Sequence, residues 1–557
     1  MNQRTVQWLV LIPVGLFAFF GNLHLALFEG SEGLYAQVTR EMVHARQFTS
    51  LTYQGEPYAN KSPLFFWTLA LSTGLFGEHE VALRLPGALF GFGTMVLTYA
   101  LGKALFSRTA AFWPALVVPT THVFLWYGRR VLFDSMLTFF ITLALLAWVR
   151  AHIQKSASGW YVLAFLSMAV AAMTKGLHGF LLPLAVIALF LVMTRDAAPL
   201  KHPGVWVGLG LSMALLIGYS FSLDVELRKH FNPVKGIQSA FEFFNTERSP
   251  AGHPVYWYLL MMWFDFFPWC VLVPSSLLLL IGKRPAAAHQ ADSFVLAWVA
   301  GMFAVLSLAT LKREPYVMPL VPGLGLMIGS YRRAMEDASE RDRGSTALLR
   351  LLLVVLAAVV CAAVVVGPSL LHPRWNIEPS LFPAAYIVSM LTLAVALIYS
   401  VARFRLRSAF HVTGVLAVGF AFGMVQFILP AIDQAGSAKR ISQDIKLLAE
   451  TSDPSLHLYT PQWPKNEDAV YYLNLPPSLP RLSSERELID LVRERGQVSA
   501  VMDKPVFDQL RQRKDLIIEQ TGEFHQPRNK SLYLLMIRTH TADPIETSER
   551  RSVTHAR

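Results

Sequence analysis

Long apolar runs, separated by short polar turns, fill most of the chain up to about residue 433. A helix needs about 20 mostly apolar residues to cross the hydrocarbon core of a bilayer. Windows close to that length predict about thirteen spans, near residues 7–27, 82–105, 109–126, 133–150, 159–174, 177–194, 204–222, 256–282, 294–311, 315–331, 348–371, 381–402 and 409–433. The pattern therefore predicts a membrane all-α domain over residues 1–435, built as a polytopic bundle.

The pattern changes after residue 440. Short β-like runs, "LHLYT" at 456–460, "VSAVMD" at 498–503 and "SLYLLMI" at 531–537, alternate with charged helical segments. This alternation predicts a small α/β soluble domain over residues 440–540. Residues 541–557 are polar and charged, and we expect a disordered tail there.

The composition indicates a membrane protein, and the distribution of charge predicts which loops face the cytoplasm. Hydrophobic residues make up 54% of the 557 residues and the mean hydropathy is +0.41, which excludes an ordinary soluble domain. The net charge of +11 is spread over alternate short loops rather than over one surface, so it indicates topology and not nucleic-acid binding. The positive-inside rule places those loops in the cytoplasm. Residues 28–81 and the C-terminal domain are then extracytoplasmic, in a multi-pass protein of the cytoplasmic (inner) membrane.

The first outward loop, residues 28–81, carries polar residues at membrane depth. Its segment "SEGLYAQVTREMVHARQF" predicts an amphipathic helix along the interface, preceded by Glu29 and containing Glu32. Pro63 can begin a second short helix, and Lys61 lies just before its N-terminus, where anions bind well. A structural alternative for Glu32 is that Ser31 and Glu32 simply cap the helix.

More ionisable residues fall at the outward ends of other spans. Asp134 opens the fourth span, Lys175 lies in the turn "MTKGLHGF", and Lys312 and Arg313 form a basic pair on the side where the charge rule disfavours one. Binding of an anion would explain that exception. The structural alternatives are that Asp134 pairs with a nearby arginine and that Lys175 anchors a helix end in the headgroups.

Six segments in order resemble the GT-C superfamily of lipid-phosphosugar glycosyltransferases. They are "EGSEGLYAQVTREM", "GEPYANKSPLFFW", "RRVLFDSMLTFF", "MTKGLHGFLLPL", "GHPVYWYLLMMWFDFFPW" and "KREPYVMPLVPG", and they cover roughly residues 1–330. The most similar group comprises the bacterial enzymes related to dolichyl-phosphate-mannose-protein mannosyltransferases, including the lipid A aminoarabinose transferase. The resemblance implies a polyprenyl-phosphate sugar as donor and an acceptor presented from the same outer side.

The resemblance also implies roles for single residues. Asp134 matches the family's fourth-span acid, and Lys61 matches the residue that holds the donor phosphate. Glu32 keeps one acid of the family's Asp-Glu pair, whereas Ser31 replaces the other, for which Glu29 could substitute. Asn60 stands where the lipid A enzyme has a metal-binding glutamate, and His253 resembles the partner histidine. One amide and one imidazole fall short of the three or four protein ligands usual for zinc, so no cofactor is established and a divalent metal is the open alternative.

Together these observations predict an inverting glycosyltransferase that moves a sugar from a polyprenyl phosphate to a glycolipid such as lipid A. The expected catalytic residues are Asp134, Glu32 and Glu29. The residues expected to bind the donor phosphate are Lys61, Lys312, Arg313, Tyr35, Tyr58 and Lys175. Protein O-glycosylation is the alternative reaction, and a lipid-linked sugar transporter or a degenerate subunit is the non-enzymatic alternative. A transporter would need polar residues across the midplane, whereas the charges here lie on one side.

Overall fold

The computed structural model forms two compact units. The first comprises Met1–Leu25, Val38–Leu370 and Glu378–Pro430, and the second comprises Ala26–Gln37, Leu371–Ile377 and Ala431–Arg557. The structure describes residues 3–26, 30–155, 157–225, 227–228, 253–282, 289–309, 312–335, 343–367, 369, 380–436, 439, 443, 456–458, 471–472, 485–513, 515–526 and 530–539.

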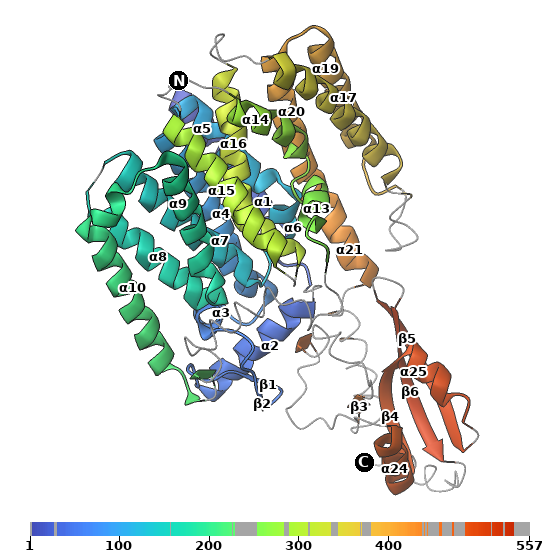
Figure 1. Ribbon diagram of the computed structural model, residues 1–557. Coiled ribbons are helices and arrows are strands. Elements are labelled where there is room, and N and C mark those ends of the chain that lie inside the picture. The colour runs from blue at the N-terminus through green and yellow to red at the C-terminus, as the bar shows by residue number, and fades with distance from the viewer. Residues whose placement is uncertain are drawn as a thin grey trace. The chain divides into compact units, whose positions relative to one another are not determined.

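The first unit is a bundle of helices (Figure 1). Its α-helices are α1 (Gln3–Phe20), α2 (Gly30–Ala45, which begins in the second unit), α3 (Pro63–Phe76), α4 (Glu80–Leu105), α5 (Arg108–Thr120), α6 (His122–Tyr127), α7 (Phe133–Trp148), α8 (Gly159–Lys175), α9 (His178–Thr194), α10 (Pro203–Ser222), α13 (Trp257–Asp265), α14 (Val273–Ile281), α15 (His289–Leu308), α16 (Val321–Ala334), α17 (Arg343–Val365), α19 (Ala384–Ala402) and α20 (Leu406–Gly423). Helix α21 (Leu429–Gly436) begins in the first unit and continues into the second. Shorter 3-10 and π segments are η1 (Val149–Ile153), η2 (Ala198–Lys201), η4 (Trp269–Leu272), η6 (Glu314–Leu320) and η8 (Met424–Ile428).

Length and apolar composition make this a multi-pass membrane protein. Among the described residues, seven helices are long and apolar enough to cross a bilayer: α4, α7 with η1, α10, α15, α17, α19, and α20 continued through η8. The bent pair of α13 and Trp269–Ile281 raises that number to eight if it counts as one span. Helices α1, α3, α5, α8 and α9 are apolar but shorter, so the expected number of thirteen spans is not confirmed.

Three predicted spans are interrupted, and prolines lie at each interruption. The run 109–126 divides into α5 and α6 at Thr121, two residues after Pro119, and the run 256–282 bends by 118° around Pro268. The run 315–331 begins as the 3-10 segment η6, which contains Pro319. Proline lacks an amide hydrogen and disrupts the regular α-helical ladder, which an apolar count over the sequence does not register.

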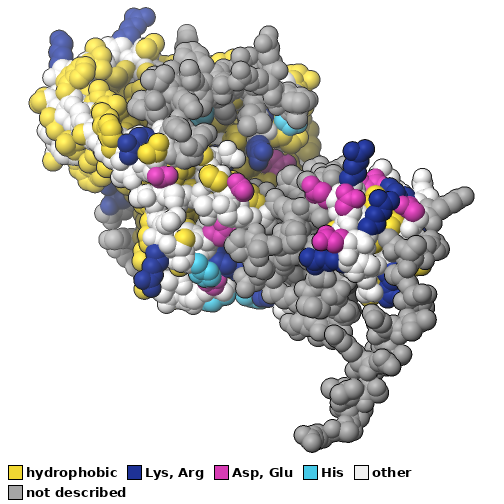
Figure 2. Space-filling view, turned by 90° about the horizontal axis from the view of Figure 1, so that it is seen from below, with side chains coloured by type: hydrophobic (Ala, Val, Ile, Leu, Met, Phe, Trp, Pro, Cys, Tyr) yellow, Lys and Arg dark blue, Asp and Glu magenta, His cyan; other side chains and the backbone are white. Residues whose placement is uncertain are grey.

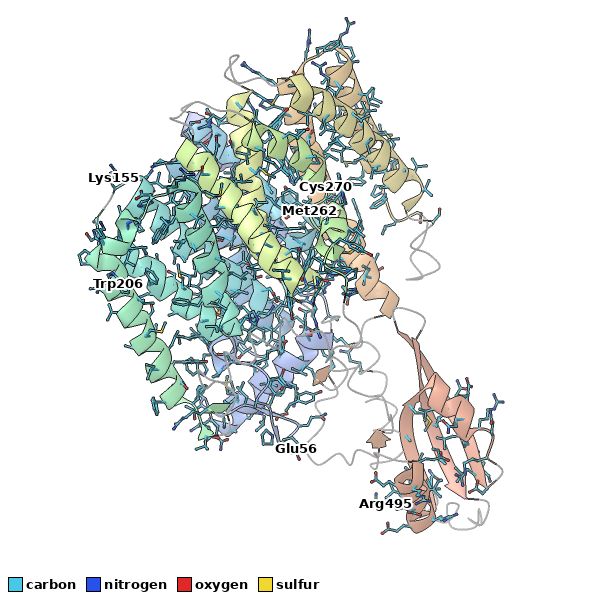
Figure 3. The ribbon with its side chains drawn as sticks, viewed as in Figure 1. Glu56, Lys155, Trp206, Met262, Cys270 and Arg495 are labelled. Carbon is cyan, nitrogen blue, oxygen red and sulfur yellow. The ribbon has the colours of Figure 1, made fainter. Side chains whose placement is uncertain are left out.

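Lipid-facing and protein-facing helices differ in burial. Only 22% of the spanning window of α10 is buried inside the protein, and Trp206 on that helix is 60% exposed (Figure 3). The α7 window, in contrast, is 67% buried. Lys155 and Glu56 lie far apart in the helical unit (Figure 3), and the side of the membrane that each loop faces stays a prediction.

Close helix packing fixes the turn that carries Lys175. Helix α8 packs against α7, α9 and α10, and the 3-10 segment η6 packs against α7. Gly176 ends α8 with a φ of +84°, a conformation that favours glycine. A Cβ on Gly179 would lie 2.3 Å from the backbone of Ala171, so α8 and α9 meet here without room for a side chain.

The second unit contains a four-stranded sheet of order β3-β4-β6-β5. Strand β3 (Leu456–Leu458) is parallel to β4 (Gln497–Asp503), and β6 (Lys530–Thr539) is antiparallel to both β4 and β5 (Leu516–Gln526). Helices α24 (Glu485–Arg495) and α25 (Lys504–Leu510) cover its core, which includes Leu488, Phe507 and Ile537. Acidic and basic side chains are interspersed on this unit, whereas hydrophobic side chains cover the flank of the helical unit (Figure 2).

Strands β3, β4 and β6 fall on the three predicted β-like runs, and β5 was not predicted. The domain boundary at residue 440 and the side of the membrane that this domain faces stay predictions. The expected disordered tail, 541–557, lies outside the described residues.

The tight α8–α9 turn gives a test of the packing. We expect Gly179→Ala to lower the free energy of unfolding by about 1–3 kcal/mol, because its new methyl group must push Ala171 away. The melting temperature of the detergent-solubilised variant should fall accordingly. Gly218→Ala on α10, where nothing lies within 4 Å of the new Cβ, is the matched control and should leave the melting temperature unchanged or raised. Equal melting temperatures for the two variants would contradict the close approach of α8 and α9.

Candidate active site

A buried ion pair joins two helix ends at the centre of the candidate site. Lys175, the last residue of α8, places its Nζ 2.5 Å from Oδ1 of Asp134 in the first turn of α7. Asp134 is 4% exposed, and the positive end of the α7 dipole favours its negative charge. The Nζ of Lys175 also lies 4.0 Å from the ring centroid of Tyr316, a cation–π contact from η6.

Lys61 lies beside this pair because the start of α3 is tied to the end of α8. Ser62 is the residue before the first turn of α3, which Pro63 begins. The Ser62 hydroxyl donates to the carbonyl oxygen of Met173 in α8 and also contacts the hydroxyl of Tyr219 in α10. The expected helix after Lys61 is present, and contacts with α8 and α10 hold its N-terminus in place.

The surroundings of Lys61 lower the pKa of its ammonium group. Burial lowers the pKa of Lys61 to about 8, the neighbouring charges of Lys175 and Arg313 act in the same direction, and Asp134 opposes them. Three cations and one carboxylate thus lie within electrostatic range of one another. Such an excess of positive charge suits an anionic ligand.

Tyr258 of α13 connects the segment before η6 to the rest of the site. Its hydroxyl donates to the carbonyl oxygen of Arg313 at 3.1 Å and accepts from the Arg313 amide at 3.2 Å. The Arg313 side chain is exposed. These two backbone bonds fix the position of Arg313 while its guanidinium remains accessible.

Lys312 has a different environment from the other predicted cations. It is 5% exposed, and its ammonium donates to the carbonyl oxygens of His253, at 3.0 Å, and Ala309. These bonds tie the segment before α13 to the end of α15. Two of its three N–H donors are thus used by the backbone, and its role in phosphate binding stays a prediction.

Two acids near the site were not identified from the sequence. Glu314, the first residue of η6, accepts a hydrogen bond from the hydroxyl of Tyr127. Asp265, the last residue of α13, is 1% exposed. Glu314 lies in the motif segment "KREPY" and Asp265 in "MMWFDFFPW". The signal that could have found Asp265 was a lone acid in an apolar segment, and for Glu314 it was an acid next to a basic pair.

The structure does not test the roles predicted for the residues of the first loop. Glu29 lies outside the described residues. Glu32 and Tyr35 lie in α2, are 0% and 7% exposed, and belong to the second unit, so their catalytic and binding roles stay predictions. Tyr58 is half-buried, and its amide donates to Leu51 at 2.8 Å beside the hairpin of β1 (Thr52–Tyr53) and β2 (Glu56–Pro57).

The described residues do not fit a divalent metal. His253 and Asn60 are exposed, and the imidazole of His253 stacks on Trp257 with ring centroids 4.6 Å apart. Within the described ranges no group of three His, Cys, Asp or Glu side chains could hold a metal ion. We derive no step through a metal.

Comparisons with known proteins agree with the resemblance seen in the motifs. The sequence profile of the dolichyl-phosphate-mannose-protein mannosyltransferase family matches residues 60–220, which include Lys61, Asp134 and Lys175. An uncharacterized protein of Aquifex aeolicus is 26% identical over 470 residues, which are 84% of this chain and 85% of that protein. An undecaprenyl phosphate-alpha-4-amino-4-deoxy-L-arabinose arabinosyl transferase of Pseudomonas fluorescens is 27% identical over 342 residues, 59% of this chain and 60% of its own length.

The fold is shared with a solved membrane enzyme. The crystal structure of ArnT from Cupriavidus metallidurans bound to undecaprenyl phosphate superposes with a TM-score of 0.70 at 18% identity, over 95% of this chain and 97% of that chain. The matches in sequence and fold thus cover the same helices that bring Lys61, Asp134 and Lys175 together. This chain is a membrane glycosyltransferase that is similar to the protein mannosyltransferases and to the lipid A aminoarabinose transferases.

Proposed function

We propose that the chain transfers a sugar from a polyprenyl-phosphate donor to a glycolipid acceptor such as lipid A, at the outer face of the cytoplasmic membrane. The observation that carries the proposal is the buried Asp134–Lys175 pair with Lys61 and Arg313 in electrostatic range. A phosphate with a polyprenyl tail could place its charge among those cations while its tail lies in lipid. The undecaprenyl phosphate in the related ArnT crystal structure supports this class of ligand.

The cations stabilise the leaving group. In a single displacement, an acceptor hydroxyl oxygen bonds to the anomeric carbon, and the bond between that carbon and the phosphate oxygen breaks. The bonding electron pair stays on the polyprenyl phosphate, whose growing charge faces Lys61, Lys175 and Arg313. The anomeric configuration inverts because the nucleophile enters opposite the leaving group.

Asp134 takes the proton in this scheme. Its carboxylate is bound to Lys175 in the structure, and a bound phosphate would compete for the same ammonium. Donor binding would therefore free an Asp134 oxygen to accept the hydroxyl proton from the acceptor. Glu32 is the second proposed acid, with Glu29 beside it in sequence.

Reconstitution tests the reaction. The purified protein in proteoliposomes, incubated with an undecaprenyl-phosphate sugar and lipid A, should give a lipid A product heavier by one sugar residue in mass spectrometry. The match to the protein mannosyltransferase family favours a protein hydroxyl as the alternative acceptor. Sugar on a membrane protein instead of lipid A would select that alternative, and absence of transfer to either acceptor class would contradict the proposal.

Asp134 and Lys61 are the residues whose loss should be most severe. We expect Asp134→Asn and Lys61→Ala each to lower the transfer rate at least about 100-fold, the range typical for a lost general base or a lost charge on the leaving group. Lys61→Ala should keep a melting temperature near that of wild type, whereas Asp134→Asn should lower it because Lys175 loses its partner, with both variants still folded at the assay temperature. Normal turnover in either purified variant would refute its assignment.

A matched carboxylate controls for general effects of losing a charge. Asp196, just after α9, has its Oδ2 3.3 Å from Nε2 of His152, near the other end of α9 from Lys175. Asp196→Asn removes the same charge as Asp134→Asn at a distance from the site. We expect its transfer rate to be within about twofold of wild type, since surface pairs contribute little.

The pH dependence follows from Lys61. Because its pKa is lowered to about 8, Lys61 is charged below that pH and loses its charge as the pH rises through 8. We expect kcat/KM, which reports the free enzyme, to fall about tenfold per pH unit above pH 8. Lys61→Arg keeps its charge throughout this range and should flatten the profile, so an unchanged slope in that variant would assign the pH effect to another group.

A further inference from the structure

A glutamate of α2 binds the turn of the hairpin formed by β1 and β2. Glu41 is half-buried, and its carboxylate accepts a hydrogen bond from the Thr52 hydroxyl at 2.8 Å. The same carboxylate accepts from the amide of Gln54 at 2.7 Å and from the amide of Gly55 at 3.2 Å. Hydrogen bonds to a charged acceptor are stronger than those between neutral groups. One side chain of α2 therefore holds the turn through three donors.

The sequence of the hairpin favours this turn only in part. Each strand has two residues, and Thr52 is paired with Pro57, which has no amide hydrogen to donate. The loop residues Gln54 and Gly55 have φ values of +55° and +79°. Positive φ at both positions is typical of a type I′ turn, which suits glycine and asparagine better than glutamine. Since an isolated two-stranded hairpin is only marginally stable, the Glu41 carboxylate makes a needed contribution.

The hairpin fixes one end of the segment that carries Lys61. The amide of Tyr58 donates to the carbonyl oxygen of Leu51 at 2.8 Å, so the pairing extends one residue beyond β2. Four residues later, the hydroxyl of Ser62 is bound to the carbonyl oxygen of Met173 in α8. The chain from Tyr58 to Ser62 is thus held at both ends, and Lys61 lies within it.

Helix α2 is itself attached to the elements around it, which fixes Glu41 relative to α3. Nε of Arg40 lies 3.0 Å from Oε2 of Glu78, which precedes α4. The indole of Trp67 in α3 donates to the carbonyl oxygen of Phe48 at 2.7 Å. The end of α2 and the chain after it are therefore joined to α3 and to the turn before α4.

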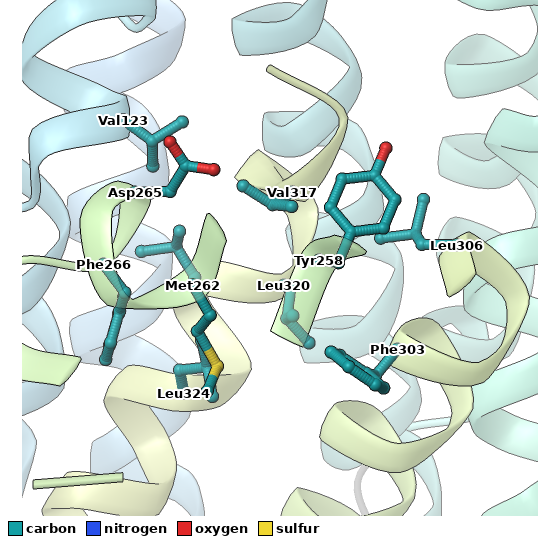
Figure 4. A pocket seen from close by; sticks show the side chains of 11 residues that line it. Val123, Tyr258, Met262, Asp265, Phe266, Phe303, Leu306, Val317, Leu320 and Leu324 are labelled. Atoms are coloured by element: carbon teal, nitrogen blue, oxygen red, sulfur yellow. The ribbon is translucent and has the colours of Figure 1, made fainter. Parts of the chain in front are cut away.

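The other cations of the candidate site have supports of their own. Lys175 is held by its ion pair with α7. The backbone of Arg313 is bound by Tyr258, which is 1% exposed and lines a small, mostly apolar cavity together with Phe303 (Figure 4). For Lys61 the corresponding support comes from the chain on either side of it.

We propose that Glu41 is a positioning residue for donor binding: it holds the hairpin of β1 and β2 in the conformation that places Tyr58 and Lys61 at the donor phosphate. Glu41 itself need not contact the donor. This inference rests on the proposed function for the identity of the ligand, a polyprenyl phosphate. If Glu41 only stabilised the hairpin, its loss would leave the affinity for that ligand unchanged.

The first test compares two glutamates of the same loop. Glu41→Ala should weaken the binding of undecaprenyl phosphate to the protein in nanodiscs at least about tenfold, because a lost contact between the Lys61 ammonium and a phosphate costs about that much. Glu56→Ala removes the same charge from an exposed position of the hairpin (Figure 3), and its dissociation constant should stay within about twofold of wild type. Equal dissociation constants for the two variants would overturn the inference.

The pH dependence of binding separates positioning from a general loss of stability. Burial lowers the pKa of Lys61 to about 8, Lys175 and Arg313 act in the same direction, and Asp134 opposes them. Release of Lys61 from this position raises its pKa, so the fall in undecaprenyl-phosphate affinity above pH 8 should move to higher pH in Glu41→Ala. Loss of the Glu41 charge alone would act in the opposite direction. A fall at the wild-type pH or below it would overturn the positioning role.

A rescue and a milder variant keep the test independent of folding. Gln54→Asn supplies a residue that a type I′ turn prefers, so in the Glu41→Ala background it should restore the affinity to within about threefold of wild type. Failure of this rescue in a folded protein would overturn the inference. Thr52→Val removes one of the three donors to Glu41 and should weaken binding by a smaller factor than Glu41→Ala. If Glu41→Ala does not fold, unchanged binding in Thr52→Val would overturn the inference instead.

Transfer and binding together distinguish this inference from the proposed function. If Glu41→Ala weakens undecaprenyl-phosphate binding as expected while the wild type transfers sugar to neither lipid A nor protein, the inference stands and the proposed reaction is wrong. If the wild type transfers sugar, and Glu41→Ala binds and transfers as Glu56→Ala does, the inference is wrong and the proposed function stands.

Discussion

The ion pair between Asp134 and Lys175 is the interaction on which the site depends. Both charges lie at helix ends inside an apolar bundle, where removing one partner of a buried pair typically costs about 3–5 kcal/mol because the other charge is left uncompensated. The pair therefore fixes the end of α8 against the start of α7. The position of Lys61 is fixed as well, because the hydroxyl of the adjacent Ser62 donates a hydrogen bond to the carbonyl oxygen of Met173 near the end of α8. One ion pair and one hydroxyl group thus bring Lys175 close to Asp134, which is 41 positions away in the chain, and to Lys61, which is 114 positions away.

The apolar pattern was enough to predict the helices but not their interruptions. Every predicted span contains a helix of the structure. A chain segment that crosses the bilayer core must form an apolar helix, and a long apolar run in the sequence is the direct sign of that requirement. The breaks at Thr121 and around Pro268, and the 3-10 start of η6, depend on how neighbouring helices satisfy the freed backbone groups. For example, the amide of His122 donates to the carbonyl of Phe267, a bond between segments 145 positions apart that no local pattern predicts.

The sequence predicted several residues of the candidate site, but it did not predict which of them contact one another. Ionisable residues in apolar segments stand out in the sequence, and Asp134, Lys175 and Lys61 were found in that way. The arginines near Asp134 in sequence offered an obvious partner for it, whereas the structure places the ammonium of Lys175 at its carboxylate. Lys312 stood out equally, yet its ammonium binds the carbonyls of His253 and Ala309, because a buried ammonium takes whatever oxygens the fold brings near it. Glu314 and Asp265 were overlooked because each is a single acid within a motif that was interpreted through its basic or aromatic residues.

The departure from the family at Asn60 changes the charge balance of the site in a definite direction. A glutamate at that position, as in the lipid A enzyme, would place a negative charge next to Lys61 in sequence, whereas the asparagine here adds none. Lys61 then has two cations and one carboxylate in range, and burial together with those cations holds its pKa near 8. Further negative charge near Lys61 would raise this pKa. If an anionic phosphate binds beside Lys61 as proposed, it supplies such a charge, and donor binding and the protonation of Lys61 would then reinforce each other.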